Sequence, residues 1–218
     1  MAYKYLSNTE EKPSALIKPT VILVEGEDDG IFLEQLFDSR GEDPTRIQIL
    51  FIKGISKLWS YLSALTKSPI FVEGSIKGIC VIIDADRDFA QTETFARSQF
   101  RKSNLAEPAS SSIEEKDGVR IGLYILPNSS DNGELEDLII GTLSHETRII
   151  DAQALLTKHT PPQADFKKRS KRVLQISLAL SDTDLCAGIG RGIRNGAFEV
   201  NTANFSDLNE FLDRFLAD

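Results

Sequence analysis

The sequence contains few cysteine and histidine residues, and this scarcity excludes several classes of protein. Its 218 residues include two cysteines, Cys80 and Cys186, and two histidines, His145 and His159. No Cys-x-x-Cys pair occurs, and the histidines do not have the spacing of zinc ligands. A zinc-finger protein and a disulfide-rich secreted protein are therefore excluded.

Long hydrophobic runs are also missing. No apolar run approaches the ~18 residues that a membrane-spanning helix requires. The first 19 residues are polar, are interrupted by Pro13 and Pro19, and lack the apolar centre of a signal peptide. Hydrophobic residues still make up 41% of the chain, which is enough for a folded core. These features predict a cytoplasmic protein that does not contact a membrane.

Acidic residues outnumber basic ones, with 33 Asp and Glu against 25 Lys and Arg and a net charge of −8. The whole excess lies before Asp151, because the segment from Asp151 to Asp218 is neutral. A broad basic surface for nucleic acid is not evident. The excess acid is either a solvated surface or a pocket that needs a cation, and the composition leaves both readings open.

Short apolar runs alternate with helical patterns along the chain. The runs at 21–24, 47–52, 79–83 and 119–126 are predicted to be strands. Strands that alternate with helices are typical of a mostly parallel sheet. We therefore expect an α/β fold with a central, mostly parallel sheet of about four strands flanked by helices. The helices are expected over residues 28–37, 56–65, 89–100, 134–143, 151–158, 165–180 and 206–216.

The same pattern divides the chain into three parts. We expect an N-terminal arm over 1–19, an α/β domain over 20–150 and a mainly helical C-terminal extension over 151–218. The polar stretch 107–117 and the glycine-containing stretch 188–196 are both predicted to be flexible loops.

Carboxylates follow two of the predicted strands directly. Glu25 directly follows the first strand, and Asp84 and Asp86 follow the third. An open parallel sheet binds its ligands beyond the carboxyl ends of its strands, so these side chains are expected to converge there. Converging carboxylates repel one another, and Mg²⁺ or Mn²⁺ relieves the repulsion because hard cations prefer oxygen ligands. The alternative is that the acids near these strands only cap helices.

These residues resemble the Toprim domain, which is shared by topoisomerases, bacterial primases, recombination mediators and OLD-type nucleases. The resemblance covers about residues 20–126 and implies a compact Rossmann-like fold. It implies that Glu25 acts as a general acid or base or binds metal, and that Asp84 and Asp86 are magnesium ligands. Asp29 matches the acidic residue that follows the glutamate motif, and Asp88 is a further candidate ligand.

Residues 133–138 (GELEDL) resemble a short standalone Toprim-like family of unknown function, whose members also end in a helical segment. Such relatives often carry a glycine-rich turn after the second strand, where this chain has only Gly54. In OLD-type nucleases, further acids complete a two-metal site. By that resemblance Glu134 and Glu136 are candidate ligands, although both would also suit the first turn of a helix without binding metal.

Basic residues near the predicted site are candidates for binding a phosphate group. Lys53 and Arg87 lie close to strand ends, and Lys168 and Arg172 share one face of a predicted helix. Each could instead neutralise neighbouring acids or face solvent.

The sequence therefore supports two functions. The first is a magnesium-dependent phosphotransferase or nuclease that acts on nucleic-acid phosphodiesters, with DNA favoured over RNA, in defence or repair. The second is a Toprim-like module that binds nucleic acid or protein without catalysis, together with a separate partner such as an ATPase. A third and weaker hypothesis is phosphoester chemistry on a nucleotide. The sequence also allows a homo-oligomer.

Overall fold

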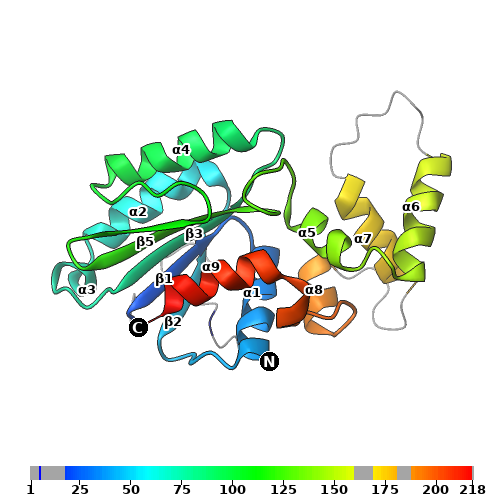
Figure 1. The fold of residues 1–218 in the computed structure, drawn as a ribbon, viewed down its shortest axis with the longest axis horizontal. Helices are drawn as coiled ribbons and strands as arrows, with labels where there is room; N and C mark the ends of the chain where they lie inside the picture. Colours follow the sequence, from blue (N-terminus) through cyan, green and yellow to red (C-terminus); the bar gives the residue numbers. More distant parts are fainter. Residues whose placement is uncertain (1–4, 6–17, 160–168, 181–187, 218) are drawn as a thin grey trace.

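Five strands form one central sheet in the computed structural model, which describes residues 5, 18–159, 169–180 and 188–217 (Figure 1). The strands lie in the order β2-β1-β3-β5-β4, with four of them parallel and β4 antiparallel to β5. The α/β fold with a mostly parallel sheet is thus confirmed, and a fifth strand is added. The strands are β1 (Thr20–Val24), β2 (Ile47–Phe51), β3 (Gly78–Asp84), β4 (Ser112–Lys116) and β5 (Val119–Leu126).

Strand β4 occupies part of the stretch that was expected to be a flexible loop, so that prediction was wrong. Asp117 and Gly118 connect β4 to β5, and both have positive φ angles, of 53° and 76°. Asp-Gly with two positive φ angles is typical of a tight two-residue hairpin turn. The polar strand lies at the edge of the sheet, where Glu114 and Glu115 are exposed to solvent.

Helices cover both faces of the sheet, because alternate strand residues point to opposite sides. In β1, Ile22 and Val24 belong to one hydrophobic cluster, whereas Val21 and Leu23 belong to a second cluster on the other face. Figure 1 shows α2 and α4 together on one face and α1 and α9 on the other. These helices are α1 (Glu27–Arg40), α2 (Leu58–Thr66), α4 (Phe89–Lys102) and α9 (Ser206–Leu216), with the short α3 (Pro69–Val72) following α2.

The remaining helices continue the chain beyond the carboxyl ends of the strands. Figure 1 shows α5, α6 and α7 past that end of the sheet. Their bounds are α5 (Leu135–Thr142), α6 (Thr147–His159), α7 (Arg169–Ala179) and α8 (Ile189–Arg194), with single 3₁₀ turns η1 (Ile55–Lys57) and η2 (Thr202–Asn204). The first part of the helix expected over 165–180 lies outside the described residues.

The prediction of a second flexible loop, over 188–196, was also wrong, because most of these residues form α8. Its glycines permit close packing rather than flexibility. A Cβ atom on Gly190 would lie 2.4 Å from Asp28 Oδ1, and one on Gly192 would lie 2.4 Å from Leu178 Cδ2. Helix α8 therefore packs closely against α1 and α7, where a side chain at either glycine would clash.

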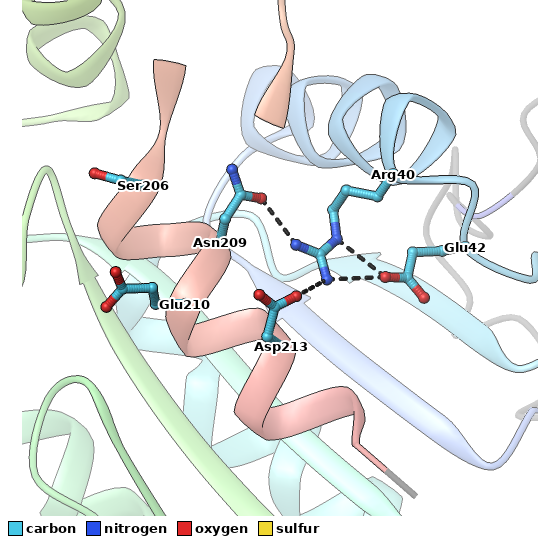
Figure 2. A pocket seen from close by; sticks show the side chains of 6 residues that line it. All are labelled: Arg40, Glu42, Ser206, Asn209, Glu210 and Asp213. Carbon is cyan, nitrogen blue, oxygen red and sulfur yellow. Dashed lines mark hydrogen bonds and ion pairs between the residues drawn. The ribbon is translucent and has the colours of Figure 1, made fainter. Parts of the chain in front are cut away.

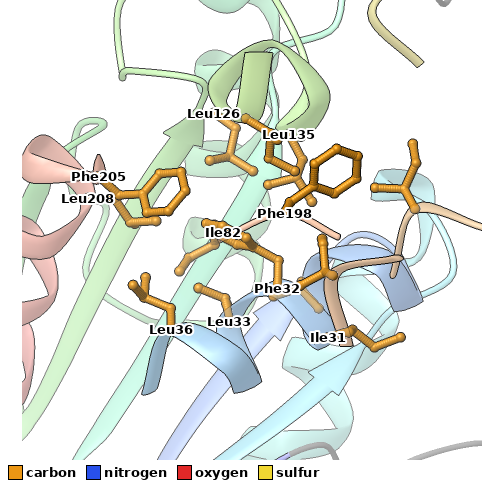
Figure 3. Close-up of a cluster of buried hydrophobic side chains, with 14 of the residues drawn as sticks. Ile31, Phe32, Leu33, Leu36, Ile82, Leu126, Leu135, Phe198, Phe205 and Leu208 are labelled. Atoms are coloured by element: carbon orange, nitrogen blue, oxygen red, sulfur yellow. The ribbon is translucent and has the colours of Figure 1, made fainter. Parts of the chain in front are cut away.

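The C-terminal extension shares its hydrophobic core with the sheet. Figure 3 shows side chains from α1, β3, β5 and α5 meeting Phe198 and Phe205 of the extension. The Phe32 and Phe205 rings lie edge to face, 5.0 Å apart between centroids. In α9, Phe215 packs against Gly78 and Gly122, where a Cβ atom would come within 3.0 Å of its ring. The last predicted helix therefore packs on the sheet through its aromatic side chains.

Helix α1 extends to Arg40, three residues beyond its predicted end. Gly41 follows it in a left-handed conformation with φ 72°, which is typical of a helix C-terminus. The N-cap residue of α1 is Gly26, and that of α5 is Glu134. Across the described parts of the chain, no helix combines the length and apolar character needed to cross a bilayer.

Candidate functional site

The predicted acidic residues lie where three parallel strands end side by side. β1 pairs with β3, with Val24 opposite Ile82, and β3 pairs with β5, with Asp84 opposite Leu126. Glu25 directly follows β1, and Asp84 is the last residue of β3. The sheet order therefore brings the two motifs to neighbouring positions at one edge.

Glu25 is held by the loop that follows β2. Its carboxylate oxygen Oε1 accepts a hydrogen bond from the Ile55 backbone N–H at 3.4 Å. Its backbone carbonyl accepts another from the Gly54 N–H at 3.1 Å. The second carboxylate oxygen, Oε2, is buried and has no hydrogen-bond partner in the described part of the chain. A buried acceptor without a partner is costly, so this oxygen is suited to receive a proton or a cation.

Asp29 and Asp84 each bind a backbone amide at the start of a helix. Asp29 Oδ2 accepts from the Gly26 N–H at 2.7 Å, and Asp84 Oδ1 accepts from the Leu135 N–H at 3.0 Å. These bonds fix the two carboxylates at the first turns of α1 and α5. Asp86 has a positive φ of 51°, and its N–H donates to the Gly133 carbonyl at 2.9 Å. Its exposed side chain lies in the loop that joins β3 to α4.

The carboxyl groups interact electrostatically as one cluster. Burial raises the pKa of Asp29 to about 7, with additional repulsion from Glu136, Glu25 and Asp28. Burial also raises the pKa of Asp84 well above its usual value, and Asp29, Glu136 and Glu25 raise it further. The pKa of Glu25 is raised by burial and by the charge of Asp86. Each ionised group thus opposes the ionisation of its neighbours.

The acids near α5 have different surroundings. Glu136 is buried, 6% exposed, and its Oε1 lies 3.5 Å from Lys171 Nζ of α7. Glu134 caps α5, while the N3 residue Asp137 accepts from the Glu134 N–H at 2.8 Å. Burial and the charge of Glu136 raise the pKa of Glu134. Glu136 therefore belongs to the cluster, because its charge acts on Asp29 and Asp84, whereas Glu134 borders the cluster and also serves as a helix cap.

The remaining candidates are more scattered. Asp88 is exposed and caps α4, since it accepts a hydrogen bond from the Gln91 N–H at 2.9 Å. This agrees with the alternative that the acids near the strands only cap helices. Lys53 and Arg87 are exposed in loops that follow β2 and β3, and Arg172 is exposed on α7. The predicted Lys168 lies outside the described residues.

Sequence reasoning missed two residues that hold this region together. Lys171 forms an ion pair with Glu136, and Asp28 Oδ1 accepts a hydrogen bond from the Gly190 N–H at 2.9 Å. Lys171 lies between the predicted phosphate-binding residues Lys168 and Arg172. Only the fold brings it to Glu136, which lies 35 positions earlier in the sequence.

The donor chemistry of the cluster suits a hard divalent cation, since all the candidate ligands are carboxylates. Such an ion would coordinate the unpartnered Glu25 Oε2. It would also reduce the repulsion between carboxylates that raises the pKa values of Asp29 and Asp84. Among the residues that the structure describes, however, no three His, Cys, Asp or Glu side chains are already arranged to hold a metal ion. The side chains would therefore have to move to ligate one.

A pocket elsewhere has a structural explanation. Figure 2 shows Arg40 reaching from the end of α1 toward α9. Its guanidinium donates to Asn209 Oδ1 at 2.9 Å and Asp213 Oδ1 at 2.6 Å, and it pairs with Glu42 at 2.9 Å. The arginine thus joins α1 to α9, at the end of α1 remote from Glu25.

Comparison with known proteins identifies a family but no characterised relative. The model of a family described as "Protein of unknown function (DUF3226)" matches residues 19–217. No curated protein and no solved structure gives a significant match. Because the family model spans both the sheet and the C-terminal helices, the chain belongs to the DUF3226 family.

Proposed function

We propose that this protein is a magnesium-dependent phosphotransferase or nuclease of Toprim type that acts on nucleic-acid phosphodiesters in the cytoplasm, in defence or repair. The observation that carries the proposal is the electrostatic cluster of Glu25, Asp29, Asp84 and Glu136 at the carboxyl edge of a parallel sheet. Such an edge is where open α/β sheets bind their ligands. Concentrated negative charge at that edge suits a cation-dependent reaction.

Each residue has a role that follows from its surroundings. Glu25, Asp84 and Asp86 would hold Mg²⁺ or Mn²⁺, with Glu136 and Glu134 as candidates for a second position. When bound, the ion supplies charge stabilisation for the phosphoryl oxygens. The pKa of Glu25, which burial raises, suits a group that accepts or donates a proton in the reaction. Lys53 and Arg87, exposed at strand ends, would attract the phosphate backbone.

A cleavage assay tests this proposal directly. Supercoiled plasmid, single-stranded DNA and RNA would be incubated with the protein and Mg²⁺ or Mn²⁺. We expect metal-dependent cutting, reduced at least about 100-fold in Glu25→Gln and in Asp84→Asn. Glu115→Gln, on the exposed edge strand β4, is the matched control and should cut like the wild type. Wild-type activity in either site variant would refute the assignment.

A second candidate is the module that binds without cutting. It is favoured by the engagement of Asp29 and Asp84 with backbone amides and of Glu136 with Lys171. In this reading the carboxylates stabilise the starts of α1 and α5, and a separate protein such as an ATPase supplies the reaction. Folded wild-type protein that cuts no substrate alone but co-purifies with such a partner would support it.

A further inference from the structure

The segment that includes β2 and α2 differs in charge from the rest of the molecule. Residues 44–72 contain four basic residues and no acidic residue, in a chain with a net charge of −8. The four are Arg46, Lys53, Lys57 and Lys67. The segment therefore carries a formal charge of +4, and the remainder carries −12. A surface built from this segment is suited to an anionic partner, unlike its surroundings.

The only tryptophan of the protein lies in this segment and is exposed. Trp59, in the first turn of α2, is 47% exposed, although a tryptophan is usually well buried. Lys53, Ser56, Lys57 and Ser60 around it in the sequence are exposed too. Neither lysine forms an ion pair with another described residue. An exposed indole that is close in the sequence to exposed lysines without an ion pair can stack on a base while the ammonium groups contact phosphates.

The position of Trp59 connects it to the acidic edge. The Ile55 N–H donates to Glu25 Oε1, and Trp59 follows Ile55 by four residues. Their Cα atoms therefore lie no more than about 15 Å apart. Figure 1 shows α2 running from the end of the sheet where the site lies toward α3 at the opposite end. Trp59 is in the first turn, on the side of the site.

We propose that Trp59, with Lys53 and Lys57, forms a stacking site for single-stranded nucleic acid that leads to the carboxylate cluster. This inference rests on the proposed function for its substrate class and specifies the strand form. A duplex has its bases paired and stacked internally, so only an unpaired base can stack on the indole. Charge favours nucleic acid over a protein partner here, because the exposed indole lies in a segment that is purely basic.

The single tryptophan allows a binding test that does not depend on cleavage. In chelator, where metal-dependent cutting is absent, oligo-dT and oligo-rU would be titrated into the full-length protein while its tryptophan emission is recorded. We expect saturable quenching with one or both oligomers, and their relative affinities separate DNA from RNA. An abasic oligomer of equal length should bind more weakly and leave the emission unchanged. If neither oligomer quenches the emission, the inference is refuted and a protein partner becomes the remaining hypothesis for this surface.

Variants separate stacking from charge. Trp59→Leu should weaken binding of a fluorescently labelled oligomer by about 5- to 150-fold, whereas Trp59→Phe should retain part of the affinity. Phe95→Leu, at an exposed aromatic on α4, is the matched control and should bind normally. Lys53→Gln and Lys57→Gln should each reduce the salt dependence by about 0.7 in log–log slope. Lys67→Gln, at the other end of α2, should not.

The two proposals fail in different ways. Quenching without metal-dependent cutting would support the stacking site and contradict the nuclease. Cutting that is abolished by Asp84→Asn but unaffected by Trp59→Leu, with unchanged oligomer affinity, would support the nuclease and contradict the stacking site.

Discussion

The Asp29 carboxyl is buried beside like charges, yet it is held in place by a backbone amide. Burial and repulsion raise its pKa to about 7, while the hydrogen bond from Gly26 opposes that shift. In the unfolded chain its pKa returns to about 3.8. Between these values the folded state holds a proton that the unfolded state has lost. The contribution of Asp29 to folding stability is therefore greatest below about pH 4 and is lost as the pH rises through 7.

We expect Asp29→Asn to stabilise the metal-free protein at pH 8 by about 1 to 3 kcal/mol, because an amide does not ionise. Its oxygen can still accept the Gly26 hydrogen bond. Urea unfolding in chelator between pH 5 and pH 8.5 measures the effect, which should shrink toward pH 5. Glu115→Gln serves as the control. A variant that is less stable than the wild type at pH 8 would show that the ionised carboxylate stabilises the fold.

The ion pair between Lys171 and Glu136 gives a second prediction at this scale. Lys171→Met leaves the buried Glu136 without its cation, so we expect a loss of about 1 kcal/mol in the free energy of unfolding. Adding Glu136→Gln should recover most of that loss, because the uncompensated charge is removed. A double-mutant cycle with urea unfolding measures the coupling, and additive effects would mean that the pair contributes nothing.

Residue types at strand ends could be predicted, whereas their surroundings could not. Glu25, Asp84 and Asp86 are recognisable because each closely follows a short apolar run. Asp29 of α1 interacts with the charge of Glu136 of α5, and Glu136 pairs with Lys171 of α7, so each interaction joins residues that are remote in the sequence. No local pattern encodes such a contact.

At the scale of elements, the packing of α8 against α1 and α7 requires glycine at two positions. Gly190 and Gly192 face Asp28 and Leu178 at distances too short for a Cβ atom. Gly190→Ala and Gly192→Ala should each cost about 1 to 3 kcal/mol through overpacking. Gly141→Ala on α5 is the matched control, because nothing lies within 4 Å of its added Cβ. That control should be neutral or stabilising, and thermal unfolding of all three variants compares them.

The predicted strands and most helices follow from periodicity, because burial on both sides produces short apolar runs. Strand β4 was missed because its residues, SIEEK, are mostly polar at a sheet edge, although Asp117-Gly118 was a usable hairpin signal. Helix α8 was missed because glycine lowers helix propensity, and only tertiary packing explains its two buried glycines.

At the scale of the whole molecule, one hydrophobic cluster joins the first strand to the last helix. It includes Ile22 of β1, Phe32 of α1, Leu174 of α7, Ile193 of α8 and Phe215 of α9. Removal of residues 151–218 would expose the face of the sheet that carries Ile22 and Cys80. We expect the fragment 1–150 to be unfolded or aggregated, as measured by circular dichroism and size-exclusion chromatography. A monomeric fragment with cooperative unfolding would show that the α/β part is an independent domain.

In the carboxylate cluster, the requirements of folding stability and of the proposed activity are opposed. The like charges around Asp29 and Asp84 oppose folding near neutral pH, and the proposed chemistry requires those same charges. A laboratory selection for heat resistance in the presence of chelator would therefore discard these acids among its first substitutions. The heat-resistant variants would carry neutral side chains at the carboxyl ends of the strands and would lose the proposed activity. Directed evolution of this protein therefore has to select for activity as well as for stability.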